Sequence, residues 1–234
     1  MNDQKPTVLI VDDDPKVLEG FRHLLELNDY RVETFSSSSA LLNSPLGDDV
    51  PYCAIVNAQM PRITGLQLQS LLVKKRSGLP VIFVSGEGDI SKAVCAMRAG
   101  ATDFLVKPIE GQKLLDVVKR AFVLERRIRL EREERVICRN RFNSLTLREK
   151  EVCAFVAQGK LNKQIAAELG ICEKTVKVHR GRVMKKMQVA SVAELVRIVV
   201  KLDTLPAGFK GQWHGDVNAR ATWPPLPIMR AARC

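Results

Sequence analysis

The chain has 234 residues, 46% of them hydrophobic, and carries a formal net charge of +11 at pH 7. This length and composition allow one large domain or two smaller domains with real cores. No apolar run approaches the roughly 18 residues of a transmembrane helix, and the acidic start MNDQKPTVLIVDDD does not suit a secretory signal.

The six cysteines are scattered and form no C-x-x-C pair. We therefore expect reduced, mainly buried thiols in a cytoplasmic protein. The positive charge is uneven: residues 1–110 carry −3, residues 111–144 carry +5, residues 145–202 carry +7 and residues 203–234 carry +2. An acidic first half joined to a basic second half indicates two domains, with a polyanionic partner assigned to the second.

The first half alternates short apolar strands with amphipathic helices. Strands are predicted at 7–11, 31–35, 53–57, 81–84 and 102–106, and helices at 14–27, 37–43, 64–75, 90–99 and from 112 onward. Strands that alternate with helices indicate a parallel sheet covered on both faces, which is a doubly wound α/β fold. In such a sheet, ligands bind beyond the carboxyl ends of the strands.

Polar residues stand at the ends of four predicted strands. They are Asp12, Asp13 and Asp14 after the first, Asn57 at the third, Ser85 at the fourth and Lys107 at the fifth. Clustered carboxylates repel one another unless a cation joins them, which implies a hard divalent ion such as Mg²⁺. A hydroxyl and an ammonium beside them suit a phosphoryl group. The alternative is a helix N-cap at Asp13 or Asp14 before Pro15, plus unrelated loop residues, and it explains one aspartate but not the convergence.

The segments VLIVDDDPKVL, CAIVNAQMPRITGLQL, VIFVSGEGDI and GATDFLVKP resemble the blocks of a bacterial response-regulator receiver domain. The resemblance covers residues 5 to about 123. It implies a first domain at residues 1–123 with a flavodoxin-like fold and a five-stranded parallel sheet. It places the paired acids of the family at Asp12 and Asp13, its hydroxyl switch residue at Ser85, its aromatic switch residue at Phe104 and its lysine at Lys107. It also implies a cis peptide bond between Lys107 and Pro108.

The phosphoacceptor aspartate of that family aligns with Asn57, in a register that Met60-Pro61 and Gly65 fix. A neutral carboxamide cannot form the acyl phosphate that an anionic carboxylate forms. It also removes one negative charge, so we expect no required cofactor and only weak Mg²⁺ binding at Asp12 and Asp13. Asn57 can still hydrogen-bond Lys107. The usual phosphorylation switch is therefore predicted to be absent, and Asp12 or Asp13 as a substitute acceptor is the disfavoured alternative.

Residues 124–144 are predicted to form a helical linker that continues the last helix of the first domain. The stretch is highly charged, and opposite charges recur at helical spacing in the pairs Arg127–Glu131 and Glu131–Arg135. The apolar repeat spans scarcely two heptads, so a solvated single helix and a dimeric coiled coil both remain open.

The second domain is predicted at residues 145–202 as four short helices that begin with a capping box at Thr146 and Glu149. Helices at 162–169 and 173–187 flank Gly170, because glycine enters the left-handed conformation at low cost. On a helical wheel the second of them has a core stripe of Val176, Val183 and Met187. The opposite stripe is Lys174, Lys177, Val178, Gly181 and Lys185. Such a basic stripe suits a DNA major groove, and the alternative is a solvated charged face with an incidental glycine.

The segments LTLREKEV, GKLNKQIAAELGI, EKTVKVHRGRVMKKM and SVAELV resemble the LuxR/FixJ-type helix-turn-helix domain. The resemblance implies that the helix from Glu173 is the recognition helix. Its groove-facing set would be Lys174, Lys177, Val178 and the backbone of Gly181, and its phosphate-facing set Asn162, Lys163, Thr175 and Lys185. His179 is predicted to be a packed helix residue. The family usually has Ser or Thr where Cys172 stands, so we expect a poor cap and a buried, inert thiol there.

Residues 203–234 match no pattern and are predicted to be disordered. The favoured function is a non-enzymatic, sequence-specific transcriptional regulator that binds double-stranded DNA as a homodimer and is not controlled by phosphate at the usual site. The alternative is an interaction protein whose pseudo-receiver docks or titrates a histidine kinase or a related regulator. No membrane partner is expected.

Overall fold

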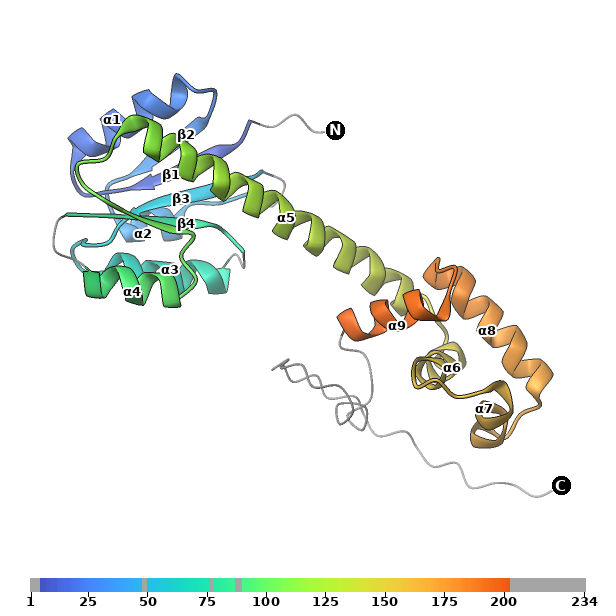
Figure 1. The fold of residues 1–234 in the computed structure, drawn as a ribbon. Coiled ribbons are helices and arrows are strands. Elements are labelled where there is room, and N and C mark those ends of the chain that lie inside the picture. The colour runs from blue at the N-terminus through green and yellow to red at the C-terminus, as the bar shows by residue number, and fades with distance from the viewer. Residues whose placement is uncertain (1–4, 48–49, 76–77, 87–89, 203–234) are drawn as a thin grey trace. The chain divides into compact units, whose positions relative to one another are not determined.

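The computed structural model describes residues 5–47, 50–75, 78–86 and 90–202 of the chain. The chain divides into two compact units, Met1–Glu131 and Arg132–Cys234 (Figure 1). The tail that was predicted to be disordered, residues 203–234, lies outside the described residues. Within the described part of the chain, no helix is long and apolar enough to span a membrane.

The first unit contains a five-stranded parallel sheet in the order β2-β1-β3-β4-β5, which confirms the predicted doubly wound fold. The strands are β1 Thr7–Val11, β2 Arg31–Phe35, β3 Tyr52–Asn57, β4 Val81–Ser85 and β5 Asp103–Val106. Strands β1 and β4 are buried along their whole length, and β3 is buried up to its last residue. Parallel strands that are covered on both faces have this continuous apolar character.

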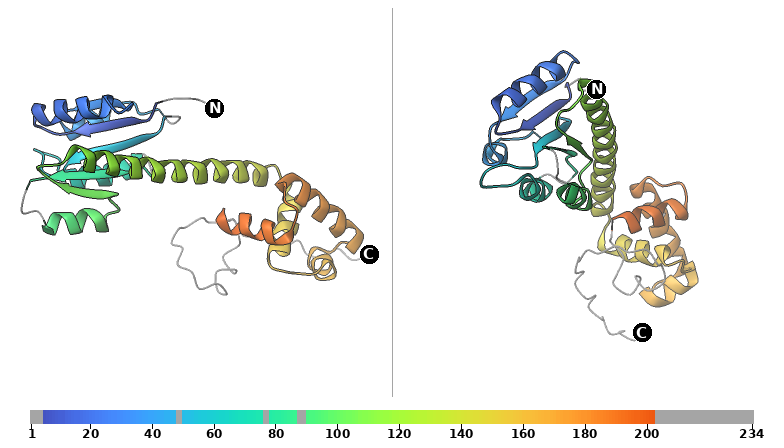
Figure 2. Two further views of the ribbon diagram at one scale, coloured as in Figure 1. Left: turned by 45° about the horizontal axis from the view of Figure 1, so that its top comes forward. Right: turned by 60° about the vertical axis from the view of Figure 1, so that its left-hand side comes forward.

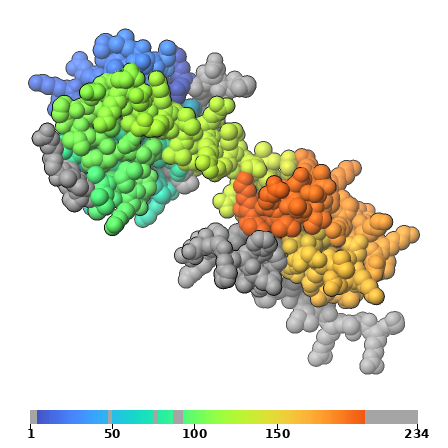
Figure 3. Space-filling view, viewed as in Figure 1, coloured from blue at the N-terminus to red at the C-terminus, as the bar shows by residue number. Residues whose placement is uncertain are grey.

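Helices cover both faces of the sheet (Figure 2). They are α1 Pro15–Glu26, α2 Ser38–Asn43, α3 Gly65–Lys75, α4 Ile90–Arg98 and α5 Gly111–Asn143. Residues of α1 and of the first turns of α5 pack on one face, and residues of α2, α3 and α4 pack on the other. Alternate residues of the strands supply the two cores, as Leu9 and Ile10 of β1 illustrate. In the space-filling view, green residues from the part of the chain that includes α4 and the start of α5 form much of the visible surface of this unit, with blue residues of the N-terminal part beside them (Figure 3).

Predictions about the start of α1 and about the length and ion pairs of α5 can be compared with the structure. Asp14, and not Asp13, is the N-cap of α1, because its side chain accepts from the Lys16 N–H at 2.9 Å. The helix from Gly111 runs without a break to Asn143, as the charge pattern predicted. The Arg127 Nε atom donates to Glu131 at 3.0 Å, which confirms one of the two predicted pairs.

The second unit contains the four predicted helices. They are α6 Leu147–Ala157, α7 Asn162–Leu169, α8 Glu173–Met187 and α9 Val192–Lys201. The capping box at the start of α6 is present, with reciprocal bonds between Thr146 and Glu149. Cys138 and Phe142, from the last turns of α5, are buried in the same core as these helices. Two residues of the predicted linker therefore help to form the second core.

Candidate acidic pocket and nucleic-acid interface

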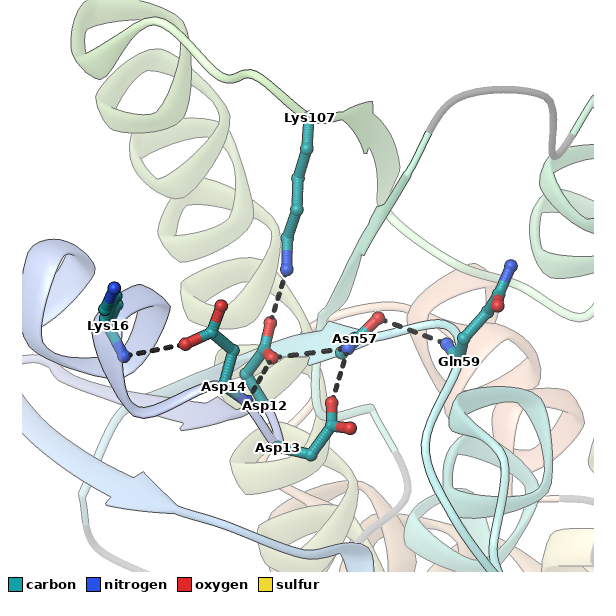
Figure 4. Close-up of polar contacts among 7 residues, drawn as sticks. All are labelled: Asp12, Asp13, Asp14, Lys16, Asn57, Gln59 and Lys107. Carbon is teal, nitrogen blue, oxygen red and sulfur yellow. Dashed lines mark hydrogen bonds and ion pairs between the residues drawn. The ribbon is translucent and has the colours of Figure 1, made fainter.

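The polar residues at the strand ends converge beside the central strands of the sheet (Figure 4). Asp12 directly follows β1, and Asn57 ends β3, the strand that pairs with β1 through Val11 and Val56. Lys107 follows β5. In the strand order β2-β1-β3-β4-β5, the direction of winding changes between β1 and β3, where ligands bind sheets of this type.

Asp12 is buried, with 2% of its surface exposed, and its charge is compensated by Lys107. The Lys107 Nζ atom donates to Asp12 Oδ2 at 2.8 Å, and the Asp14 backbone N–H donates to Asp12 Oδ1 at 3.0 Å. Lys107 is held in place by its own backbone, because its N–H donates to the Ser85 carbonyl at 2.8 Å. The pocket thus contains an ion pair between the buried Asp12 and the partly exposed Lys107, at the ends of β1 and β5.

The Asn57 carboxamide joins the two acids. Its Nδ2 atom donates to Asp13 Oδ1 at 2.9 Å and to Asp12 Oδ1 at 3.3 Å, and its Oδ1 atom accepts from the Gln59 backbone N–H at 3.1 Å. The opposite orientation would place the amide oxygen against two carboxylates and its N–H groups against another donor. The expectation of a bond between Asn57 and Lys107 was wrong, because Lys107 bonds Asp12 instead.

The remaining predicted pocket residues are Ser85 and Phe104. Ser85 ends β4 and is fully buried. Phe104 is half-buried in β5, and its ring centroid lies 6.4 Å from that of Phe83. The peptide bond before Pro108 is cis, as the resemblance implied. Side-chain hydrogen bonds therefore join four of the six predicted residues, Ser85 is bonded to Lys107 through its backbone carbonyl, and Phe104 lies in the neighbouring strand β5.

Gly65, the first residue of α3, lies against the backbone of the pocket. A Cβ atom at this position would come within 2.6 Å of the Asn57 carbonyl oxygen and 2.8 Å of the Phe83 ring. The Gly65 N–H donates to the Ala58 carbonyl at 3.2 Å, so the start of α3 and the end of β3 are in direct contact. The sequence analysis used Gly65 only to fix the alignment of Asn57. The close approach of Gly65 to the Asn57 backbone is visible only in the tertiary structure.

Asp12 and Asp13 were predicted to hold Mg²⁺ weakly, and the structure shows which of their oxygen atoms are already hydrogen-bonded. Carboxylate oxygens are suitable ligands for a hard cation. However, the Oδ1 atoms of Asp12 and Asp13 both accept the Asn57 amide, and Asp12 Oδ2 accepts Lys107. Across the described residues, no three His, Cys, Asp or Glu side chains are grouped to hold a metal ion. Three of the four carboxylate oxygens of Asp12 and Asp13 are thus already bonded within the protein.

In the second unit, α7 and α8 form a tight corner at Gly170. The φ angle of Gly170 is +62°, and the Ile171 N–H donates to the Ala166 carbonyl at 3.1 Å. The predicted core stripe of α8 is confirmed, since Val176, Val183 and Met187 are all fully buried. The other side of α8 is therefore turned outward.

The outward face of α8 is basic and includes an unobstructed glycine. Its exposed residues from the predicted stripe are Lys174, Lys177, Val178, Gly181 and Lys185. A Cβ atom at Gly181 would have no neighbour within 4 Å, so packing within the protein does not require a glycine there. Arg182 is also exposed and belongs to this face, because it is four residues after Val178 and three before Lys185. The prediction missed Arg182, although the same spacing rule identifies it.

The predicted phosphate-facing residues differ in their exposure and in their hydrogen-bond partners. Lys163 is exposed on α7. Asn162 is half-buried, and its Oδ1 atom accepts from Arg180 Nη1 at 3.1 Å, which ties the start of α7 to α8. The Thr175 hydroxyl lies 3.1 Å from Cys172 Sγ. His179 is half-buried, as expected of a packed helix residue.

The expectation that Cys172 is buried was wrong. Cys172 is the N-cap of α8 and is exposed, because it precedes the first turn of the helix and lies outside the core stripe. Its side chain makes no capping bond to the helix, as expected of cysteine. The hydrogen bond with the Thr175 side chain is the largest of the interactions that lower the pKa of the Cys172 thiol.

An ion pair between a buried carboxylate and a partly exposed lysine anchors α8 to α6. The Lys186 Nζ atom donates to Glu149 Oε2 at 2.6 Å, and only 2% of the Glu149 surface is exposed. The same carboxylate oxygen accepts from the Thr146 N–H at 2.9 Å. Burial raises the pKa of Glu149, but the bonds from Lys186 and Thr146 outweigh it and leave the pKa below its usual value. The basic face is thus carried by a helix that is fixed at its C-terminal end.

Comparison with known proteins matches both units. Residues 8–119 match the model of the response regulator receiver domain, and residues 143–199 match that of the bacterial regulatory proteins of the luxR family. Response regulator protein TmoT of Ectopseudomonas mendocina is 43% identical over 202 residues, which are 86% of this chain and 91% of the relative. Transcriptional regulatory protein FixJ of Azorhizobium caulinodans is 34% identical over 200 residues, covering 86% of this chain and 94% of the relative.

A solved structure gives the same result. The low-resolution structure of response regulator StyR has 43% sequence identity and a TM-score of 0.71, and the match covers 84% of this chain and 99% of that chain. These similarities extend over both units and over nearly the full length of each relative. The chain therefore belongs to the response regulators that join a receiver domain to a DNA-binding domain of the LuxR family.

Proposed function

We propose that this protein is a sequence-specific transcriptional regulator whose receiver is not controlled by phosphorylation at position 57. The observation that carries the proposal is an exposed basic α8 face on a helix anchored by Glu149 and Lys186, in a chain whose receiver pocket contains an amide at the end of β3. FixJ and TdiR, two of its relatives, are named transcriptional regulatory proteins.

The exposed side chains of α8 suggest distinct roles at DNA. Lys174 and Lys177 can donate to guanine O6 and N7, and Val178, with 48% of its surface exposed, can contact a thymine methyl group. The Gly181 backbone permits close approach. Phosphate contacts are assigned to the residues at the edge of this surface, which are Asn162, Lys163, Thr175, Arg182 and Lys185.

One such domain reads a short half-site, so we propose that two copies of the chain bind paired half-sites. The affinity of one basic helix is modest, and a dimer multiplies the number of base contacts. This arrangement requires a target with two-fold symmetry.

The control of this regulator differs from phosphoaspartate signalling. The Asn57 side chain is a neutral amide, whose oxygen cannot replace an anionic carboxylate as the nucleophile. Its N–H groups are engaged by Asp12 and Asp13, and its oxygen by Gln59. The DNA-binding surface is therefore either constitutively available or controlled by dimerisation or by another signal.

DNA recognition is tested by selecting sites for the full chain from random duplexes and measuring affinity at several salt concentrations. Lys177→Ala should relax specificity at one base pair at a cost of roughly 1–3 kcal/mol, whereas Lys163→Ala should weaken all sequences alike and reduce the salt slope by about one. Lys119→Ala, an exposed lysine of the first unit, is the matched control. Equal affinity for every duplex tested would contradict sequence-specific recognition.

The control mechanism is tested with acetyl phosphate. The wild-type chain should incorporate no phosphate, and Asn57→Asp should become phosphorylated when Mg²⁺ is supplied, because Asp12, Asp13 and Lys107 already surround that position. Incorporation at Asp12 or Asp13 of the wild-type protein would overturn this account of control. Mass spectrometry of the intact chain and of its peptides distinguishes these sites.

A second candidate function follows from the same pocket. A receiver that keeps its fold but lacks the acceptor can bind a histidine kinase or a related regulator without accepting its phosphate, and so titrate it. In that case cells that carry Lys177→Ala should keep the wild-type phenotype. If the protein acts as a DNA-binding regulator, the same substitution should produce the phenotype of a loss of function.

A further inference from the structure

The Asn57 side chain uses almost all of its hydrogen-bonding capacity inside the pocket. Each of the two acids accepts one contact from the amide nitrogen, at 2.9 Å for Asp13 and 3.3 Å for Asp12. A carboxamide nitrogen has two hydrogens, so both donors are engaged, and the oxygen accepts from Gln59. The amide therefore bridges two carboxylates, which is the task of a divalent cation in an acidic pocket.

The charges in the pocket are compensated without a metal ion. Lys107 pairs with the buried Asp12, while Asp13 is exposed to water and receives the stronger of the two amide contacts. A cation at this position needs oxygen ligands, which requires the Asn57 side chain to turn its oxygen toward the acids. That rotation breaks all three hydrogen bonds of the amide and places its N–H groups against the Gln59 N–H (Figure 4).

We propose that the Asn57 amide replaces the divalent cation, so that this receiver is folded and stable without Mg²⁺ and does not bind it. The inference rests on the proposed function in one respect, which is that position 57 no longer serves as a phosphoacceptor. It adds that the amide occupies the carboxylate oxygens that a cation would use. The substitution thus changes two properties of the pocket at once.

The reverse substitution shows what the amide does. A carboxylate has the same shape as a carboxamide, so Asn57→Asp places an oxygen where the nitrogen lies, 2.9 and 3.3 Å from two carboxylate oxygens. Two attractive contacts become repulsive ones, and a single lysine faces three acids. A bound cation offsets this repulsion, so Mg²⁺ should stabilise N57D but not the wild-type chain.

The decisive experiment measures the thermal unfolding of the full chain by calorimetry in EDTA and in MgCl₂. The transition of the wild-type receiver should not move, and isothermal titration with Mg²⁺ should give no saturable heat. The N57D variant should unfold at a lower temperature in EDTA. Its Tm should rise by roughly 5 °C at a Mg²⁺ concentration ten times its Kd.

Two further variants separate the bridge from a general charge effect. Asn43→Asp adds the same charge at an exposed residue at the end of α2 and should not create a response to Mg²⁺. The double variant D13N/N57D exchanges amide and acid across the 2.9 Å contact and should recover most of the stability of the wild-type receiver in EDTA. A double variant as unstable in EDTA as N57D alone would overturn the bridge.

Saturable Mg²⁺ binding by the wild-type chain, or a Mg²⁺-dependent rise of its Tm, would also overturn the proposal. This result needs no variant, so it decides the matter even if N57D does not fold. These measurements are independent of DNA binding and of acetyl phosphate. Failure here would leave the proposed function intact, and a non-specific DNA-binding result would leave the amide bridge intact.

Discussion

Gly181→Ala should stabilise the second unit and weaken DNA binding at the same time. Gly181 is an interior residue of α8, and glycine in a helix interior costs about 0.8–1.0 kcal/mol relative to alanine. The added methyl group would meet no atom within 4 Å, so no clash reduces this gain. The free energy of unfolding should rise by about 1 kcal/mol, which raises the Tm by about 4–8 °C for a domain of this size.

The expected loss of DNA binding has a different cause. If the α8 backbone at Gly181 approaches the groove floor, a methyl group there must displace the DNA from the helix. A loss of about 1.4 kcal/mol weakens the affinity tenfold, and we expect at least this much. Affinity is measured by fluorescence anisotropy with a selected duplex, and stability is measured by urea unfolding of the same preparations.

Gly20→Ala is the matched control. Gly20 lies within α1, is exposed, and also has no atom within 4 Å of an added Cβ. This variant should stabilise the first unit by a similar amount and leave DNA affinity unchanged. If Gly181→Ala bound DNA with the affinity of the wild type, the close approach of the α8 backbone to DNA would be refuted. The lysines alone would then account for DNA binding by this surface.

Three further substitutions test the packing around the two sites. Glu149→Gln should destabilise the second unit by about 1–3 kcal/mol at neutral pH. The pKa of Glu149 is lowered in the folded state, so its stabilising contribution is present above the unfolded pKa and is lost as the pH falls through the folded pKa. The unfolding curves of the variant and the wild type should therefore converge in acid. Gly65→Ala should cost about 1–3 kcal/mol in urea unfolding, since its Cβ would meet the Asn57 backbone at 2.6 Å; an unchanged midpoint would show that α3 can shift. Gln188→Gly should stabilise the protein by about 1 kcal/mol, because Gln188 ends α8 with a φ of +53°, and a lower Tm would indicate that its side chain makes a compensating contact.

The regular elements followed from the sequence because their signals are local. Apolar runs such as TVLIV specify buried parallel strands, and the spacing of Val176, Val183 and Met187 specifies the inner side of α8. The left-handed Gly170 and the Thr146–Glu149 capping box depend on residues within one turn of each other. Periodicity and capping are properties of neighbouring residues, so they can be deduced without knowledge of the fold.

The partners of polar side chains were decided only by the tertiary structure. Sequence reasoning brought Asp12, Asn57 and Lys107 to one edge of the sheet, but the structure decided that Lys107 bonds Asp12 and that the Asn57 amide bridges the acids. It likewise decided that Cys172 is exposed. Residues 44 and more positions apart meet there, and differences of about 1 Å select one hydrogen-bond pattern over another. Local pattern therefore determined which residues share the site, while the packing of strands and helices determined what each of them binds.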